Sequence, residues 1–232
     1  MSEFFRFPHT PHLAWLGQGT PRDDKVLSAL ETEAFLAHPV VVEEKVDGAN
    51  LGFSVDASGA IRAQNRGQYL QRPFSGQFAR LNGWLALHEE ALIDALGESL
   101  VLFGEWVAAV HSLEYGGLPD YFLVFDVYDR GTLRFWSTVR RNSFASQLGL
   151  CVIHQVGAGH YRLSSLKQMI ACTSSAYRHG GCEGIYLRHE SKDWLLARAK
   201  LVQPDFVQNI GKHWRSRSLH WNALDTDSSV TH

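Results

Sequence analysis

One stretch near the start of the chain combines a strand, a lysine and a turn: Pro39-Val40-Val41-Val42-Glu43-Glu44-Lys45-Val46-Asp47-Gly48-Ala49-Asn50. Its β-branched run predicts a buried strand over residues 39–44, and Asp47-Gly48 predicts a turn into a second strand over 51–55. Lys45 thus stands between a buried strand and a turn, where its amine can be desolvated. An ordinary lysine has a pKa near ~10.4, so a nucleophilic one needs burial and neighbouring cations to lower that pKa. The stretch alone leaves open an ordinary hairpin with an exposed lysine.

The composition of the 232-residue chain suits one large or two small domains with a real core, because 45% of the residues are hydrophobic. The formal net charge is −2, so a nucleic acid would need a local basic surface. The three cysteines, Cys151, Cys172 and Cys182, lack metal-binding spacing, and we expect buried thiols in a reducing compartment. No apolar run reaches membrane-spanning length and no signal peptide is evident, so we expect a cytoplasmic protein with no membrane partner.

The patterns along the rest of the chain predict one α+β domain, with antiparallel sheets and helices outside them. Further strands are predicted over 61–65, 100–107, 121–128, 132–136, 184–188 and 194–200. Helices are predicted over 24–37 with Asp24 as the cap, over 76–96, 139–148 and 164–174, and from Pro204.

Polar residues stand at the ends of these strands in a specific order: Arg66, Glu105, Phe125-Asp126, Glu183, Arg198 and Lys200. The series resembles the covalent nucleotidyltransferases, and within them the ATP-dependent RNA ligases of the RNA ligase 2 type. The matching segments are Phe7-Pro8-His9-Thr10-Pro11-His12-Leu13, Glu44 to Asn50, Asn65-Arg66-Gly67, Phe103-Gly104-Glu105-Trp106, Val110-His111-Ser112-Leu113-Glu114-Tyr115, Tyr121 to Asp126, Glu183-Gly184-Ile185-Tyr186-Leu187-Arg188 and Arg198-Ala199-Lys200.

The resemblance implies a nucleotidyltransferase fold, the ATP-grasp-like ligase adenylation domain, over residues 1–206. A short basic and aromatic segment with a tail would follow over 207–232. The implied activity joins RNA 3′-hydroxyl and 5′-phosphate ends through lysyl-AMP and RNA-adenylate intermediates, with ATP and Mg²⁺ or Mn²⁺. Related ligases usually continue into a further C-terminal domain, so an accessory protein could take its place here.

The same resemblance implies the catalytic roles. Lys45 would attack the α-phosphorus of ATP, Glu183 would help hold the metal, and Arg198 and Lys200 would neutralise the phosphate. The family usually carries lysine where Arg198 stands, and a planar guanidinium is not a point charge. Taken alone, the charges around Arg198 also suit a surface strand.

The nucleotide would be recognised by a second set of residues. The resemblance implies that Glu105 accepts hydrogen bonds from the ribose, Phe125 stacks on adenine, and Arg66 contacts phosphate or ribose. It gives Asp126 a polar role near the metal or the RNA 3′ end. Phe125 also suits a core position, and Asp126 a strand-end turn.

Three residues around Lys45 complete the nucleotide-binding set: Glu44, Asp47 and Asn50. Asn50 favours RNA over DNA joining, since DNA ligases and capping enzymes commonly carry arginine at that position; it also suits an ordinary turn. A compact DNA ligase, another nucleotidyltransferase, or a catalytically silent RNA- or nucleotide-binding module therefore remain as alternatives.

The C-terminal segment offers a candidate RNA contact. Lys212, Arg215 and Arg217 stand among histidines and tryptophans, a composition suited to a phosphate backbone. A C-terminal helix that docks its tryptophans on the body explains the same residues equally well.

Overall fold

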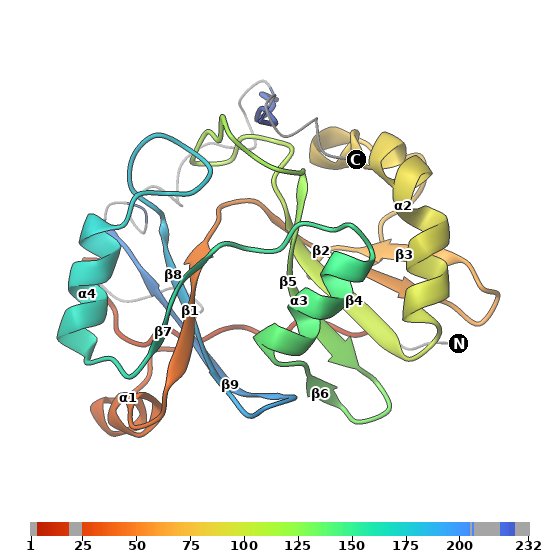
Figure 1. The fold of residues 1–232 in the computed structure, drawn as a ribbon. Coiled ribbons are helices and arrows are strands. Elements are labelled where there is room, and N and C mark those ends of the chain that lie inside the picture. Colours follow the sequence, from red (N-terminus) through yellow and green to blue (C-terminus); the bar gives the residue numbers. More distant parts are fainter. Residues whose placement is uncertain (1–3, 19–24, 205, 207–218, 226–232) are drawn as a thin grey trace.

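The computed structural model describes residues 4–18, 25–204, 206 and 219–225. Two antiparallel sheets lie side by side, with helices packed around them (Figure 1). The first sheet has the order β7 (Gln155–Gly159), β1 (Val40–Lys45), β8 (Gly184–Glu190) and β9 (Leu195–Val202). The second has the order β3 (Ile61–Gln64), β2 (Ala49–Val55), β4 (Leu100–Trp106), β5 (Phe122–Asp129) and β6 (Arg134–Phe135). The predicted α+β class with antiparallel sheets is confirmed.

The strands on either side of Lys45 belong to different sheets. β1 pairs with β7 and β8, whereas β2 pairs with β3 and β4, and residues 46–48 carry the chain across. The alternative of a hairpin with an exposed lysine is therefore wrong. Each neighbour of β1 is contributed from more than a hundred residues further along the chain, and a local turn signal cannot report that choice.

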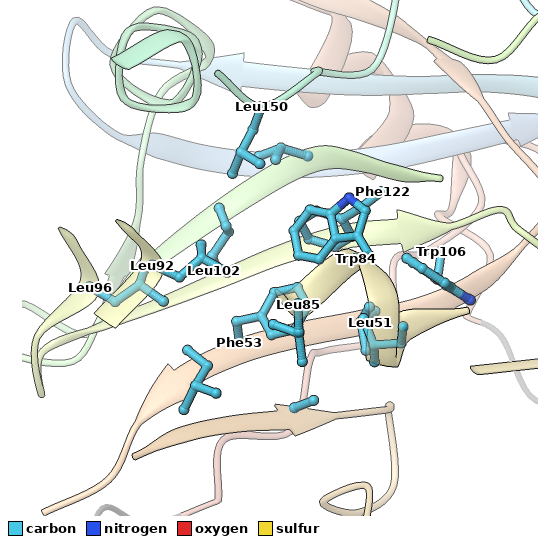
Figure 2. Packing of buried hydrophobic residues seen from close by; sticks show 14 of the residues in the cluster. Leu51, Phe53, Trp84, Leu85, Leu92, Leu96, Leu102, Trp106, Phe122 and Leu150 are labelled. Carbon is cyan, nitrogen blue, oxygen red and sulfur yellow. The ribbon is translucent and has the colours of Figure 1, made fainter. Parts of the chain in front are cut away.

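The larger core lies between the second sheet and α2 (Leu81–Leu96), as Figure 2 shows. Leu81, Trp84, Leu85, Leu92 and Leu96 recur at helical spacing and bury one face of α2. They pack against alternate residues of the strands, and the ring of Trp84 stacks on Phe53 at a centroid distance of 5.5 Å. The helix thus fixes one face of the sheet and leaves the other face toward the first sheet.

A second core covers the outer face of the first sheet. Val40 and Val42 of β1 lie in it with Ile185 and Leu187 of β8, under α1 (Ala29–Leu36) and α4 (Leu163–Cys172). Because side chains alternate along a strand, Glu43 and Lys45 lie on the opposite face. The third long helix, α3 (Thr138–Gln147), packs against β5.

Most predicted elements are present, with three differences, and one predicted burial is wrong. The first helix begins at Ala29, because Ser28 and Glu31 form a capping box; the prediction of a start at Asp24, itself outside the described residues, is wrong. The predicted 76–96 helix is a 3₁₀ turn, Gly76–Phe78, followed by α2. Strand β7 was not predicted, since its two glycines weaken the strand pattern. Cys172 is exposed at the end of α4, which contradicts its expected burial.

Among the described residues, no helix is both long enough and apolar enough to cross a membrane.

Candidate active site

A pocket lies between the inner faces of the two sheets. Its lining comes from both sheets and from the N-terminal segment: Phe7, Glu43, Glu44, Val46, Asn50, Arg66, Glu105, Phe125, Asp126, Ile153, Tyr186, Arg188 and Arg198. Its volume is about 40 Å³, which suits a few water molecules. A larger ligand therefore requires the lining side chains to move.

Lys45 faces a carboxylate at the end of β1. Its Nζ donates to both carboxylate oxygens of Glu183 at 2.7 Å, and the two side chains are 17% and 7% exposed. Burial by itself lowers the pKa of Lys45, but the negative charges of Glu183, Tyr186, Asp47 and Glu105 outweigh it and the pKa is raised. The surrounding acids thus act against the lowering that a nucleophilic lysine needs. Lys45 is therefore a protonated amine that donates to the Glu183 carboxylate.

The turn after Lys45 is fixed by the loop that follows β4. The Oδ2 of Asp47 accepts hydrogen bonds from the backbone N of Ser112 at 2.6 Å and of Leu113 at 3.2 Å, and its own backbone N donates to the Tyr115 hydroxyl at 2.8 Å. The Asp47 carboxylate therefore holds the protein backbone.

Glu105 at the end of β4 closes the same turn from the second sheet. Its Oε1 accepts from the backbone N of Gly48 at 3.0 Å. A side chain at Gly48 would bring its Cβ to 2.6 Å from the Trp106 carbonyl oxygen, so this approach needs glycine. Burial, then the charges of Asp47 and Glu183, raise the pKa of Glu105 to about 7.

The side-chain oxygens of Asn50 and Glu44 differ in whether they have a hydrogen-bond partner. Asn50 lies opposite Glu105 in the β2–β4 register, and its Oδ1 is buried with no hydrogen-bond partner among the described residues. An orphan acceptor in a pocket is costly and is satisfied by a ligand or water. The Oε2 of the buried Glu44 instead accepts from the backbone N of Ala176 at 2.9 Å.

Asp126 is bound by two arginines in the wall of the pocket. Arg188 reaches its Oδ1 at 2.8 Å and Arg198 its Oδ2 at 2.5 Å. The Arg198 guanidinium also lies over the rings of Phe135 and Phe7, at 4.1 and 4.9 Å, and its Nη2 is buried without a partner among the described residues. Asp126 thus orients two cations, one of which has a donor to spare.

A buried ion pair that was not predicted supports the base of this network. Arg141 of α3 is 0% exposed and contacts Glu43 at 2.5 Å. Arg141 and Arg188 both donate to the Phe125 carbonyl oxygen, at 2.6 and 3.1 Å, and so fix the position of that residue. The segment 183–188 already pointed to Arg188, and the predicted buried strand over 39–44 includes Glu43, but no pattern distinguished Arg141 from a solvated charge.

The remaining predicted residues occupy the edges of the pocket. The half-buried Phe125 ring meets Phe7 edge-on at 5.2 Å and lines the pocket, and Arg66 is exposed at its rim. Lys200 is half-buried on β9, two residues beyond Arg198 and thus on the same face. Lys212, Arg215 and Arg217 lie outside the described residues.

A C-terminal segment, residues 219–225, packs on the loop that holds Asp47. Asn222 is 2% exposed; its Nδ2 donates to the carbonyl oxygens of Val107 at 2.8 Å and Ala109 at 3.2 Å. Trp221 packs against the larger core and lies under Arg80 at 4.5 Å. Residues 219–225, which the prediction assigned to a separate C-terminal segment, are therefore in close contact with the first 206 residues. No local sequence signal indicates the role of Asn222.

The described residues contain no group of three or more His, Cys, Asp or Glu side chains that could hold a metal ion. Mg²⁺ is commonly bound through one or two carboxylates together with phosphate oxygens and water. Glu183, whose carboxylate contacts Lys45, suits that kind of binding.

The RNA ligase family model matches residues 38–202, and the chain belongs to this family. The predicted resemblance is thereby confirmed. A Naegleria gruberi RNA ligase, a mutant solved with ATP and Mn, is 17% identical with a TM-score of 0.59, over 76% of this chain and 53% of that one. An archaeal ATP-dependent RNA ligase is 21% identical with a TM-score of 0.58, over 85% and 48%. No curated protein matches. The chain spans about half the length of these solved ligases, and the likeness shows a shared fold.

Proposed function

We propose that the protein is an ATP-dependent RNA ligase that joins 3′-hydroxyl and 5′-phosphate ends. The carrying observation is the part-buried Lys45 amine, which contacts Glu183 between two residues that line the pocket, Glu44 and Val46, in a chain of the RNA ligase family. The solved relative with ATP and Mn supports the choice of nucleotide and a divalent ion.

The reaction has three displacements at phosphorus. Lys45 Nζ forms a bond to the α-phosphorus of ATP, and the bond to the bridging oxygen breaks as pyrophosphate leaves. The RNA 5′-phosphate then takes the adenylate from Lys45. Finally the 3′-hydroxyl attacks that phosphate, and AMP leaves. In each step negative charge at the reacting phosphate is stabilised by nearby cations.

The position of each residue in the site suggests which part of ATP it contacts. Phe125 offers a ring face for adenine, Asn50 an orphan acceptor, and Glu105 a carboxylate for the ribose. The spare Nη2 of Arg198 suits a phosphate oxygen, and Lys200 adds a second cation on the same face. Asp126 acts through Arg198 and Arg188.

Before Lys45 can attack, it must lose its contact with Glu183 and its proton. Mg²⁺ or Mn²⁺ held by Glu183 and the ATP phosphates would supply positive charge at this point. Glu183 would then bind the divalent ion instead of Lys45, and the Lys45 amine would be free to face the α-phosphorus.

The test is incubation with α-labelled ATP and Mg²⁺, followed by denaturing electrophoresis. We expect an acid-labile protein adduct that Lys45→Ala abolishes and that Lys167→Ala, a change at an exposed lysine of α4, leaves intact. Label that persists in Lys45→Ala would overturn the proposal. Its complete absence in the wild type would favour a silent binding module.

Substrate choice separates the remaining alternatives. Nicked duplexes made of RNA and of DNA, offered in parallel, should be sealed preferentially when the ends are RNA. Preference for DNA ends would indicate a compact DNA ligase, and equal adduct yields with ATP and GTP would indicate another nucleotidyltransferase. An accessory protein, if needed, would show as sealing that only a cell extract restores while the adduct forms without it.

A further inference from the structure

A second cavity lies beside α3, outside the pocket around Lys45. It has a volume of about 390 Å³, and its walls include Trp136, Arg140, Gln147, Lys192 and Asp193. None of its lining residues lines the first pocket. Its chemistry is therefore separate from that of the candidate active site.

Three cations gather around this cavity. The Arg140 guanidinium lies 3.8 Å from the ring centroid of Trp136 and 4.8 Å from that of Trp194, and Arg134 lies 4.6 Å from Trp194. Lys192 is exposed on the loop between β8 and β9.

The cations differ from those behind the active site in having no carboxylate partner. Arg141, Arg188 and Arg198 are all ion-paired, whereas within the part of the chain that the structure describes Arg134, Arg140 and Lys192 form no ion pair. Asp193 is the one acidic residue of the cavity wall. On a chain with a net charge of −2, this is a local basic surface of the kind that a nucleic acid requires.

The tryptophans add two features to this surface. Stacking on an indole holds a guanidinium in place, which lowers the entropy that it loses on binding an anion. Trp136 is only 7% exposed, and its Nε1 is buried with no acceptor among the described residues. A buried donor without a partner, on the wall of a basic cavity, suits an incoming oxygen ligand.

β6 connects this surface to the candidate active site. Phe135 lies under Arg198, which lines the first pocket, while the next residue, Trp136, lines the second cavity. The Trp136 carbonyl oxygen accepts from Arg188 Nη2 at 2.9 Å. The wall of the second cavity is therefore in direct contact with the wall of the first pocket.

From this geometry we propose that Arg134, Arg140 and Lys192, braced by Trp136 and Trp194, bind the phosphodiester backbone of the RNA strand being joined. The proposal rests on the proposed ligase function. Contact is through phosphates, so it gives affinity and register without base specificity.

The test removes two exposed charges and leaves the stacked Arg140 in place. Arg134→Gln/Lys192→Gln is compared with Arg162→Gln/Lys167→Gln, a double change of equal charge at exposed residues beside α4. Binding of a 5′-phosphorylated, fluorescently labelled single-stranded RNA is measured by anisotropy across a salt series. Melting temperatures confirm that both variants are folded.

We expect the first variant to bind about tenfold more weakly, with the slope of log K against log salt reduced by about 1.4, since each lost contact on a single strand removes about 0.7. The control variant should match the wild type, and both should form the Lys45 adduct at the wild-type rate. Equal affinity and slope in the two variants, or no RNA binding by the wild type, would overturn the site. Loss of the adduct in the wild type would instead overturn the proposed function, because adenylation needs no RNA.

Discussion

Asn222 reaches across the chain to Tyr115: its Oδ1 accepts a hydrogen bond from the Tyr115 backbone N at 2.8 Å. The Tyr115 hydroxyl in turn accepts from the backbone N of Asp47, two residues beyond the candidate nucleophile. A residue near the C-terminus thus stands two hydrogen bonds away from the turn after Lys45.

Replacing Asn222 with alanine should weaken both the fold and the adenylation step. The change leaves buried backbone groups of Val107, Ala109 and Tyr115 without a partner, so the free energy of unfolding should fall by about 2–4 kcal/mol. Urea unfolding and the initial rate of adduct formation measure the two effects. Leu219→Ala, at a side chain 46% exposed, is the control and should change neither. A normal rate in a destabilised Asn222→Ala would confine the residue to a structural role.

Two glycine-to-alanine changes should act in opposite directions. A Cβ at Gly184 would collide with the Leu201 carbonyl oxygen, so β8 and β9 would have to separate, at a cost above about 2 kcal/mol. A Cβ at Gly83 meets nothing within 4 Å, and this exposed position within α2 should gain about 0.5–1 kcal/mol. Thermal unfolding of the two variants measures these effects. Similar shifts in melting temperature would contradict the close approach of β9 to Gly184.

Glu105 should make the protein less stable as the pH rises. Burial raises its folded-state pKa to about 7, above the ordinary 4.5, so between these values the folded state binds more protons than the unfolded state. The free energy of unfolding therefore falls from pH 4.5 to 7 on this account. Glu105→Gln removes that loss, and its advantage over the wild type should grow from zero to about 3 kcal/mol by pH 7.5. Glu98→Gln, at an exposed position, serves as the control. A difference independent of pH would refute the raised pKa.

Removal of divalent ions should stop the chemistry and spare the fold. The described residues hold no group of three ligating side chains, so a metal that acts with ATP adds little stability to the free protein. EDTA should abolish adduct formation while the melting temperature moves by less than about 2 °C. Readdition of Mg²⁺ or Mn²⁺ restores labelling in the wild type. A large fall in melting temperature would instead indicate a structural metal site.

The sequence predicted the strands well because their patterns are local. The strands predicted over 184–188 and 194–200 pair as β8 and β9, and those predicted over 51–55 and 61–65 pair as β2 and β3, each with its neighbour along the chain. The assignment of β1 and β2 to separate sheets could not be predicted, since partner choice depends on residues more than a hundred positions away. The resemblance brought together Lys45, Glu105 and Glu183, which do gather around one turn.

The parts that were missed depend on tertiary contacts without a local pattern. Arg141 looks like a solvated charge in the sequence, and nothing there pairs it with Glu43; the two become a buried ion pair only where α3 and β1 meet. The Asp47 carboxylate binds backbone groups of a loop some sixty residues away, a contact that the sequence around it does not indicate. Asn222 stands in an irregular segment, where one asparagine carries no signal at all.

The pair Glu183-Gly184 joins two unrelated constraints. The carboxylate contacts Lys45, while the glycine is there because the backbone of Leu201 passes too close for a side chain. When this dipeptide is used to search other genomes, the match at the glycine position indicates only that two strands lie close together. It says nothing about the chemistry of the site. A distant relative could therefore keep the dipeptide long after its lysine is gone, and a search for working enzymes should score the lysine and the acidic residue as a couple.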